Sequence, residues 1–137
     1  MIQEQLEDIH GLLRAGRYTD ALQEVERSLL ADPQNWNLLQ FGGFACRGLE
    51  HFPRALEFYA KALDVTTMDD DRAAVLQNRG VVYQLMGKYE SAVSDLDESL
   101  RLRPWHVNAR NSLALTYGKM EKYEASRVEY EATLEYI

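Results

Sequence analysis

The side chains best suited to chemistry in this sequence are three histidines and one cysteine. Hydrolysis or group transfer would need a nucleophile such as Cys46 beside a basic side chain, together with a donor that stabilises the developing charge. No motif brings Cys46 together with His10, His51 or His106, so we interpret His51 and His106 as solvated and Cys46 as packed. We therefore predict no catalytic residues, no metal site, no cofactor and no enzymatic activity.

Three consecutive aspartates form the most acidic short run in the chain. Asp69, Asp70 and Asp71 lack the glycine and the alternating ligands that a calcium-binding loop requires. Carboxylates at the start of a helix favour its positive end and accept hydrogen bonds from its free amides. We interpret the run as a helix cap at the start of the segment that continues from Ala73 to Gln77.

The elements that carry these residues belong to an internal repeat. Four strings recur, each with an aromatic residue third and a small residue sixth: Gly16-Arg17-Tyr18-Thr19-Asp20-Ala21, Glu50-His51-Phe52-Pro53-Arg54-Ala55, Gly87-Lys88-Tyr89-Glu90-Ser91-Ala92 and Glu121-Lys122-Tyr123-Glu124-Ala125-Ser126. Their sixth residues lie 34, 37 and 34 positions apart. The spacing is therefore regular except for one insertion of three, which falls in the polar stretch 66–71.

Further columns within each copy are spaced by three, four and seven residues, which is helical periodicity rather than strand alternation. Each copy therefore predicts two helices, which in the second copy run from about 36–49 and 53–65. Glycine inside a helix costs roughly 1 kcal/mol relative to alanine, so its presence on the first helices needs a packing reason. We predict a close seam that pairs Gly43 with Ala55, Gly80 with Ala92 and Ala114 with Ser126.

In these columns the chain resembles the tetratricopeptide repeat family, whose helical hairpins recur with a period of about 34 residues. The third copy carries the family pattern most fully, with Leu76, Gly80, Tyr83, Gly87, Tyr89, Ala92, Leu96, Ser99 and Pro104. The resemblance implies an all-α fold, a right-handed α-solenoid of four helix-turn-helix repeats with about eight helices. It predicts a single domain over 1–137, with repeats at about 2–34, 35–68, 72–105 and 107–137.

The first helices of such an array line its concave side, where a partner could bind. The residues expected there are the amides Asn37, Gln40, Gln77, Asn78, Asn108 and Asn111, with an apolar floor of Phe41, Phe44, Val81 and Leu115. Carboxamides both donate to and accept from a peptide main chain, and aromatic side chains anchor apolar ones. The alternative is that Phe44 and Val81 pack between adjacent helices and that the amides are ordinary solvated surface.

Some members of the family clamp a terminal carboxylate with lysine, arginine and asparagine side chains from three consecutive first helices. In the first three copies the matching positions hold Leu6, His10, Phe41, Ala74 and Asn78, none of which is a lysine or arginine. We therefore do not expect an acidic chaperone tail as the ligand.

Composition narrows the classes of partner. The formal net charge is −7 with no basic stretch, which disfavours nucleic acid and anionic membranes as partners. The opening residues include Glu4, Glu7 and Asp8 where a signal peptide would be basic and then apolar, and the one cysteine cannot form an internal disulfide. A cytoplasmic location is expected.

The leading functional prediction is a non-catalytic scaffold or adaptor that binds a partner peptide in its concave groove. The alternative is a structural module that associates with copies of itself, or a fragment of a longer repeat array. The C-terminal helix favours that alternative, since it holds an unusual number of apolar residues for a terminal helix: Val128, Tyr130, Leu134, Tyr136 and Ile137.

Overall fold

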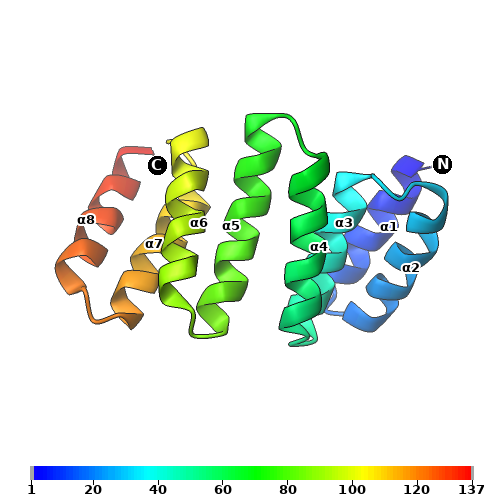
Figure 1. The fold of residues 1–137 in the computed structure, drawn as a ribbon, viewed down its shortest axis with the longest axis horizontal. Helices are drawn as coiled ribbons and strands as arrows, with labels where there is room; N and C mark the ends of the chain where they lie inside the picture. Colours follow the sequence, from blue (N-terminus) through cyan, green and yellow to red (C-terminus); the bar gives the residue numbers. More distant parts are fainter. Residues whose placement is uncertain (1, 137) are drawn as a thin grey trace. The chain divides into compact units, whose positions relative to one another are not determined.

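The chain folds into helices joined by short turns and loops (Figure 1). A computed structural model describes residues 2–136, with Tyr136 described by its main chain only. The elements are α1 (Ile2–Arg14), α2 (Tyr18–Ala31), α3 (Trp36–Gly48), α4 (Phe52–Val65), α5 (Asp69–Leu85), α6 (Tyr89–Leu102), α7 (Val107–Lys119), α8 (Tyr123–Thr133) and the short 3₁₀ helix η1 (Leu134–Tyr136). No strand occurs in the described residues. The predicted all-α fold of four helical hairpins is confirmed.

Two compact units each contain two of the hairpins. Met1–Thr66 holds α1 to α4, and Thr67–Ile137 holds α5 to α8 with η1. Within each unit the helices of a hairpin pack on each other, and the second helix of the leading hairpin packs on the first helix of the next, α2 on α3 and α6 on α7. The repeat thus has the same packing order in both units, while the organisation of the whole chain as a single domain stays a prediction.

The small-residue columns lie where the two helices of a hairpin approach each other. A Cβ added to Gly80 would lie 2.9 Å from Leu96 Cγ and 3.4 Å from the main-chain oxygen of Ala92. In the last hairpin the Ser126 hydroxyl donates to the main-chain oxygen of Ala114 at 2.7 Å. The predicted seam is confirmed at these two hairpins.

In the second hairpin an aromatic ring fills the space that the glycine leaves. A Cβ on Gly43 would lie 2.5 Å from Tyr59 Cε1, and Tyr59 is fully buried. Ala55, the predicted partner of Gly43, is also fully buried one turn earlier on α4. The absent side chain at Gly43 therefore makes room for the Tyr59 ring.

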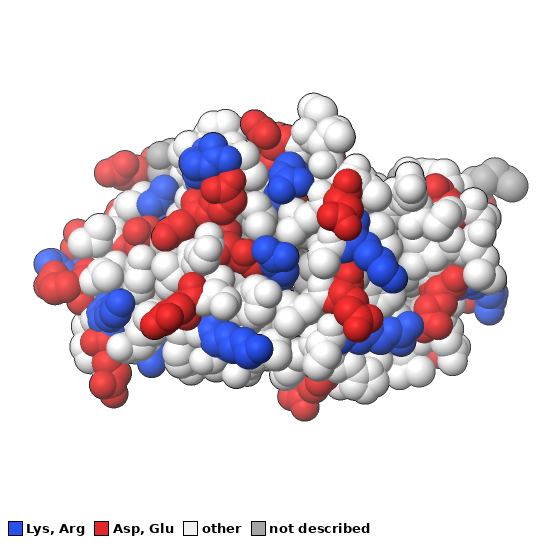
Figure 2. All heavy atoms as spheres, in the orientation of Figure 1, with Lys and Arg blue, Asp and Glu red and all other residues white. Residues whose placement is uncertain are grey.

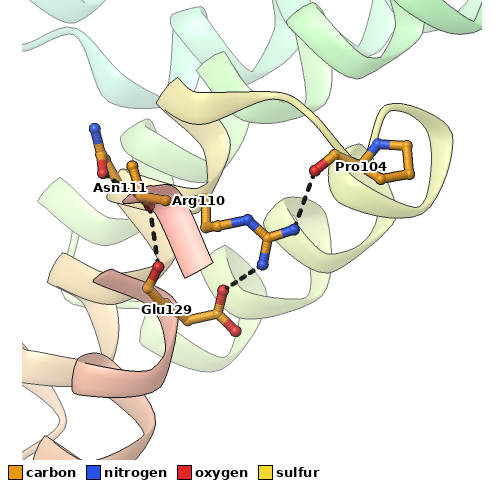
Figure 3. Close-up of polar contacts among 5 residues, drawn as sticks. Pro104, Arg110, Asn111 and Glu129 are labelled. Carbon is orange, nitrogen blue, oxygen red and sulfur yellow. Dashed lines mark hydrogen bonds and ion pairs between the residues drawn. The ribbon is translucent and has the colours of Figure 1, made fainter. Parts of the chain in front are cut away.

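Ion pairs add polar ties between helices of the second unit. The Arg79 guanidinium donates to both carboxylate oxygens of Asp95, at 2.7 and 2.8 Å, and so links α5 to α6. Figure 3 shows Arg110 of α7 reaching between two partners: it donates to the Glu129 carboxylate on α8 at 3.0 Å and to the Pro104 carbonyl at 3.0 Å. Because these pairs are largely shielded from water, each helps to hold the two helices of its hairpin together.

The aspartate run begins α5, although it does not cap it. Asp69, Asp70 and Asp71 lie in the first turn of the helix, where their charge favours its positive end. The N-cap residue is Met68, which makes no side-chain capping hydrogen bond. The predicted position at the helix start was correct, but the predicted capping role was wrong because the aspartates follow the cap.

The turn inside each hairpin has the same main-chain conformation. Its central position is occupied by Gly16, Glu50, Gly87 and Glu121, all with φ between 61° and 78°. In the second hairpin the next amide, that of His51, donates to the Cys46 carbonyl at 2.8 Å, and the other three turns make the same bond. Glycine adopts this left-handed conformation freely, whereas for an L-residue it costs about 1–2 kcal/mol.

Replacing either turn glutamate by glycine is therefore expected to stabilise the protein. Glu50→Gly and Glu121→Gly should each raise the free energy of unfolding by about 1 kcal/mol, after part of the gain is offset by the greater freedom of glycine in the unfolded chain. Urea denaturation measures the change. Gly87→Ala is the reciprocal control and should destabilise. If Glu50→Gly and Glu121→Gly both lower the free energy of unfolding, the glutamate side chains stabilise these turns and the expectation is wrong.

Candidate functional site

The ten predicted site residues all lie on first helices of hairpins. Helix α3 carries Asn37, Gln40, Phe41 and Phe44, helix α5 carries Gln77, Asn78 and Val81, and helix α7 carries Asn108, Asn111 and Leu115. Those on α3 and α5 are half-buried, and those on α7 are exposed. Helix α3 belongs to the first unit, and α5 and α7 belong to the second.

In the first unit two of the predicted residues line a pocket between α1 and α3. This pocket has a volume of about 300 Å³, and its lining consists of Gln3, Leu6, Glu7 and His10 from α1 with Asn37 and Phe41 from α3. The His10 ring stacks on the Phe41 ring, with centroids 6.0 Å apart and planes 9° from parallel. The pocket therefore combines an aromatic wall with amide and carboxylate groups.

The α1 half of this pocket was not included among the predicted site residues. Its signal was nevertheless present in the repeat. Subtracting one repeat period from Asn37, Phe41 and Phe44 gives the positions of Gln3, Glu7 and His10, which are column equivalents on the preceding first helix. The residue types differ from copy to copy, so position within the repeat identifies these residues where chemistry alone does not.

Phe44 and Gln40 are the two other predicted site residues on α3, and neither lines this pocket. The Arg47 guanidinium lies 4.3 Å from the centroid of the Phe44 ring, a cation–π contact that covers one face of the ring. The Gln40 Oε1 atom is buried and has no hydrogen-bond partner among the described residues. A buried amide oxygen without a partner costs free energy.

In the second unit one predicted amide joins two first helices. Gln77 Nε2 donates to Ser112 Oγ at 3.2 Å, which ties α5 to α7. Leu115, on α7 with Ser112, is 48% exposed and supplies apolar surface. Asn111 lies at the junction of α7 and α8 instead, where its Oδ1 accepts from the Thr133 hydroxyl at 3.3 Å.

Asn111 lines a second pocket, which lies against α8. This cavity has a volume of about 560 Å³, and its lining consists of Asn111, Tyr123, Ser126, Arg127, Tyr130, Glu131, Thr133 and Leu134. The large apolar side chains here are strongly exposed: Tyr123 at 68%, Tyr130 at 47% and Leu134 at 71%. One repeat earlier, Leu96 occupies the column of Tyr130 and is fully buried against Ala109 and Leu113 of α7. The α8 face is thus the equivalent of a helix-binding face that no described helix covers.

Burial controls the ionisation of two side chains inside the first unit. It raises the pKa of the Cys46 thiol and of the Tyr59 phenol above their ordinary values. Both groups therefore stay protonated at neutral pH. Cys46 is a free thiol that is fully buried, so the prediction that it is packed is confirmed.

His106 is half-buried at the N-cap of α7, so the prediction that it is solvated was wrong. Its Nε2 atom is buried and has no hydrogen-bond partner among the described residues. Burial lowers the pKa of the imidazole from 6.5, Arg103 lowers it further, and Asp70 opposes them. The folded protein therefore disfavours the protonated ring.

This shift predicts a pH-dependent stability. As the pH falls, His106 is protonated in the unfolded chain before it is protonated in the folded protein. The contribution of the neutral ring to the free energy of unfolding is therefore complete above pH 6.5, and it is lost as the pH falls through 6.5 towards the lower pKa of the folded state. Urea denaturation between pH 7.5 and 5.5 should show a smaller loss of stability in His106→Gln than in the wild type. His51→Gln, at an exposed position, is the matched control and should keep the wild-type slope. Equal slopes in all three proteins would contradict the assignment.

The charge distribution offers no basic surface on the face drawn in Figure 2. Acidic and basic side chains of the described residues are interspersed over each unit there. Several arginines pair with acidic residues one turn away, as Arg17 does with Asp20. Among residues 2–136, no helix has the length and apolar character needed to cross a bilayer.

Solved structures with the same fold include MamA. A crystal structure of MamA superposes with a TM-score of 0.83 at 18% identity and covers 98% of this chain and 77% of the MamA chain. MamA 41-end from Desulfovibrio magneticus RS-1 also gives a TM-score of 0.83, at 13% identity, covering 98% of this chain and 74% of the other. At these identities the likeness shows the fold alone, an α-solenoid built of helical hairpins.

Two curated relatives share parts of the sequence. The photosystem I assembly protein Ycf3 of Rippkaea orientalis is 28% identical over 93 residues, which are 66% of this chain and 54% of Ycf3. The Hsp70-Hsp90 organizing protein 3 of Arabidopsis thaliana is 43% identical over 49 residues, which are 36% of this chain and 8% of the relative. The chain thus spans about half the length of Ycf3 and under a tenth of the organizing protein.

The family model for the tetratricopeptide repeat matches residues 35–104, from the N-cap of α3 to the loop after α6. This is just over half of the chain, and it contains the copy that carries the pattern most fully. The regular repeat period, the seam of small residues and the four hairpins have the same explanation: this chain belongs to the tetratricopeptide repeat family.

Proposed function

We propose that this chain is a non-catalytic scaffold that binds a segment of a partner protein along the first helices of its hairpins. Membership of the repeat family supports a role in protein–protein interaction. The names of two relatives, an Hsp70-Hsp90 organizing protein and a photosystem I assembly protein, refer to the organization or assembly of other proteins, which also supports this role. Cys46 is a buried, free thiol, which fits the reducing cytoplasm that we propose as the location.

One observation carries the proposal: amide and aromatic side chains share a half-buried stripe on α3, and two of them line a pocket with α1. Amides such as Asn37 both donate and accept, so they suit the main chain of an extended segment. Phe41 and Phe44 offer the rigid apolar area that typically anchors a partner side chain. The stripe thus has both parts of a peptide-binding surface.

Site-specific photocrosslinking tests this proposal directly. A benzoylphenylalanine at position 44 should crosslink a partner segment from the native source, and mass spectrometry would identify the residues attached. The same probe at Leu30, which is 87% exposed on α2, is the matched control and should give no common product. Equal products from both positions, or none at position 44, would argue against binding along α3.

The exposed face of α8 favours a second candidate function, self-association. Tyr130 and Leu134 are exposed in columns whose equivalents on α6, Leu96 and Leu100, pack with residues of α7. Tyr123 is exposed beside them, and burying such side chains would stabilise an assembly. A homo-oligomer formed through the C-terminal helix is therefore the alternative proposal. Of the apolar residues that suggested it, Ile137 and the Tyr136 side chain lie outside the described part of the chain.

Sedimentation equilibrium separates this candidate from the first. Tyr130→Glu places a charge on the exposed face and should reduce an oligomer to the monomer mass, while peptide binding along α3 remains. Tyr123→Glu, on the same face, gives a second variant with the same expected result. A wild type that stays monomeric at high concentration would rule out self-association.

A further inference from the structure

We propose that the pocket between α1 and α3 selects a basic side chain, lysine or arginine, of the bound segment. This inference rests on the proposed function and names the residue class that this part of the surface recognises. The pocket is formed within the first unit by residues of two packed helices.

The electrostatics of the lining favour a cation. Glu7 is the only aspartate, glutamate, lysine or arginine among the six lining residues. Gln3 Nε2 donates to Glu7 Oε1 at 3.2 Å, which orients the carboxylate and leaves Oε2 to accept from an ammonium or guanidinium group. The Asn37 side-chain oxygen, on the opposite helix, is a second acceptor in the same pocket.

The apolar part of the lining suits the stem of a long basic side chain. Leu6 and Phe41 are half-buried walls, and the stack of His10 on Phe41 fixes the aromatic wall in place. Lysine and arginine bury their methylene stems along apolar surface while the charged head stays among polar groups. A volume of about 300 Å³ accommodates such a side chain.

Other side chains fit this lining less well. An acidic side chain would face the like charge of Glu7, and an apolar one would desolvate that carboxylate without compensation. The formal charge of −7 adds a field that attracts basic segments over a longer range. The chemistry is the opposite of a clamp for a terminal carboxylate.

Titration of the full chain with short peptides tests the inference by NMR. The probes are acetyl-Gly-Gly-X-Gly-Gly-amides in which X is lysine, arginine, norleucine or glutamate. The lysine and arginine peptides should shift amide resonances of α1 and α3 and bind about two- to fivefold more tightly than norleucine, the range of an exposed ion pair. The preference should shrink between low and high salt because the pair is screened.

Matched variants assign the preference to the pocket. Glu7→Gln keeps the shape of the side chain and should abolish the preference for lysine over norleucine. Asp8→Asn makes the same change of charge on the next residue of α1, which is exposed and does not line the pocket, and should keep the preference. Tighter binding of the glutamate peptide, or an unchanged preference in Glu7→Gln, would overturn the inference.

The outcome is separable from that of the proposed function. If photocrosslinking places a partner segment on α3 but the lysine preference is absent, the inference fails and the proposed function stands. If the lysine preference depends on Glu7 but no partner crosslinks at position 44, the pocket has its predicted selectivity and the extended binding surface fails.

Discussion

Replacing Ala92 with glutamate is expected to lower the free energy of unfolding by about 3–5 kcal/mol, the range for a buried charge without a partner. Ala92 is fully buried on α6, and its carbonyl lies against Gly80 of α5. The nearby Arg79 guanidinium is already held by both oxygens of Asp95. The new carboxylate would therefore separate the two helices or stay uncompensated between them.

Urea denaturation followed by circular dichroism measures this loss. Ser91→Glu is the matched control because it adds the same side chain one residue earlier, at an exposed position on the same helix. Its stability should stay within about 0.5 kcal/mol of the wild type. If Ala92→Glu leaves the free energy of unfolding unchanged, the close seam between α5 and α6 is contradicted.

Combining Phe44→Ala with Asn78→Ala is expected to weaken capture of the partner segment at least tenfold. The pair removes an aromatic anchor in the first unit and an amide in the second. Truncating a central aromatic anchor commonly costs about 2 kcal/mol or more, whereas a tenfold change in affinity corresponds to about 1.4 kcal/mol. Both side chains are half-buried rather than core, so the helices should persist. Quantitative capture from the native source measures the effect.

A second double variant controls for general changes of the surface. Leu30→Ala with Gln34→Ala removes one apolar side chain and one amide at exposed positions that belong to neither α3 nor α5. Capture by this variant should equal that of the wild type, and both variants should keep the wild-type dichroism. Loss of capture in both variants, or in neither, would count against binding along the first helices.

The fold could be predicted because the same helical pattern recurs in four copies of the repeat. A regular period with helical spacing inside each copy placed α3 and α4 to within one residue of their observed ends. The seam also followed from residue type, since a helical glycine such as Gly80 needs a close neighbour to offset its cost. Repetition thus averaged out the local ambiguity of any one copy.

The candidate site was predicted less completely, for two physical reasons. Glu7 and His10 occupy the columns of Phe41 and Phe44, but a carboxylate and an imidazole do not look like an aromatic floor. Asn111 follows the face-lining residues at helical spacing, yet it hydrogen-bonds to Thr133 on α8. Neighbouring faces of a helix merge into one another, and only the position of the adjoining helix decides to which surface a boundary residue belongs.

The left-handed residue at the centre of each hairpin turn has a consequence for local opening. Glu50 and Glu121 carry a conformational cost that Gly16 and Gly87 do not, although all four turns make the same main-chain hydrogen bond. Opening a turn releases that cost, so the turns of the second and fourth hairpins should open locally more often than those of the first and third. The amide hydrogen of His51 should then exchange with solvent deuterium faster than that of Lys88. Local opening would therefore alternate between frequent and rare from one hairpin to the next along the chain.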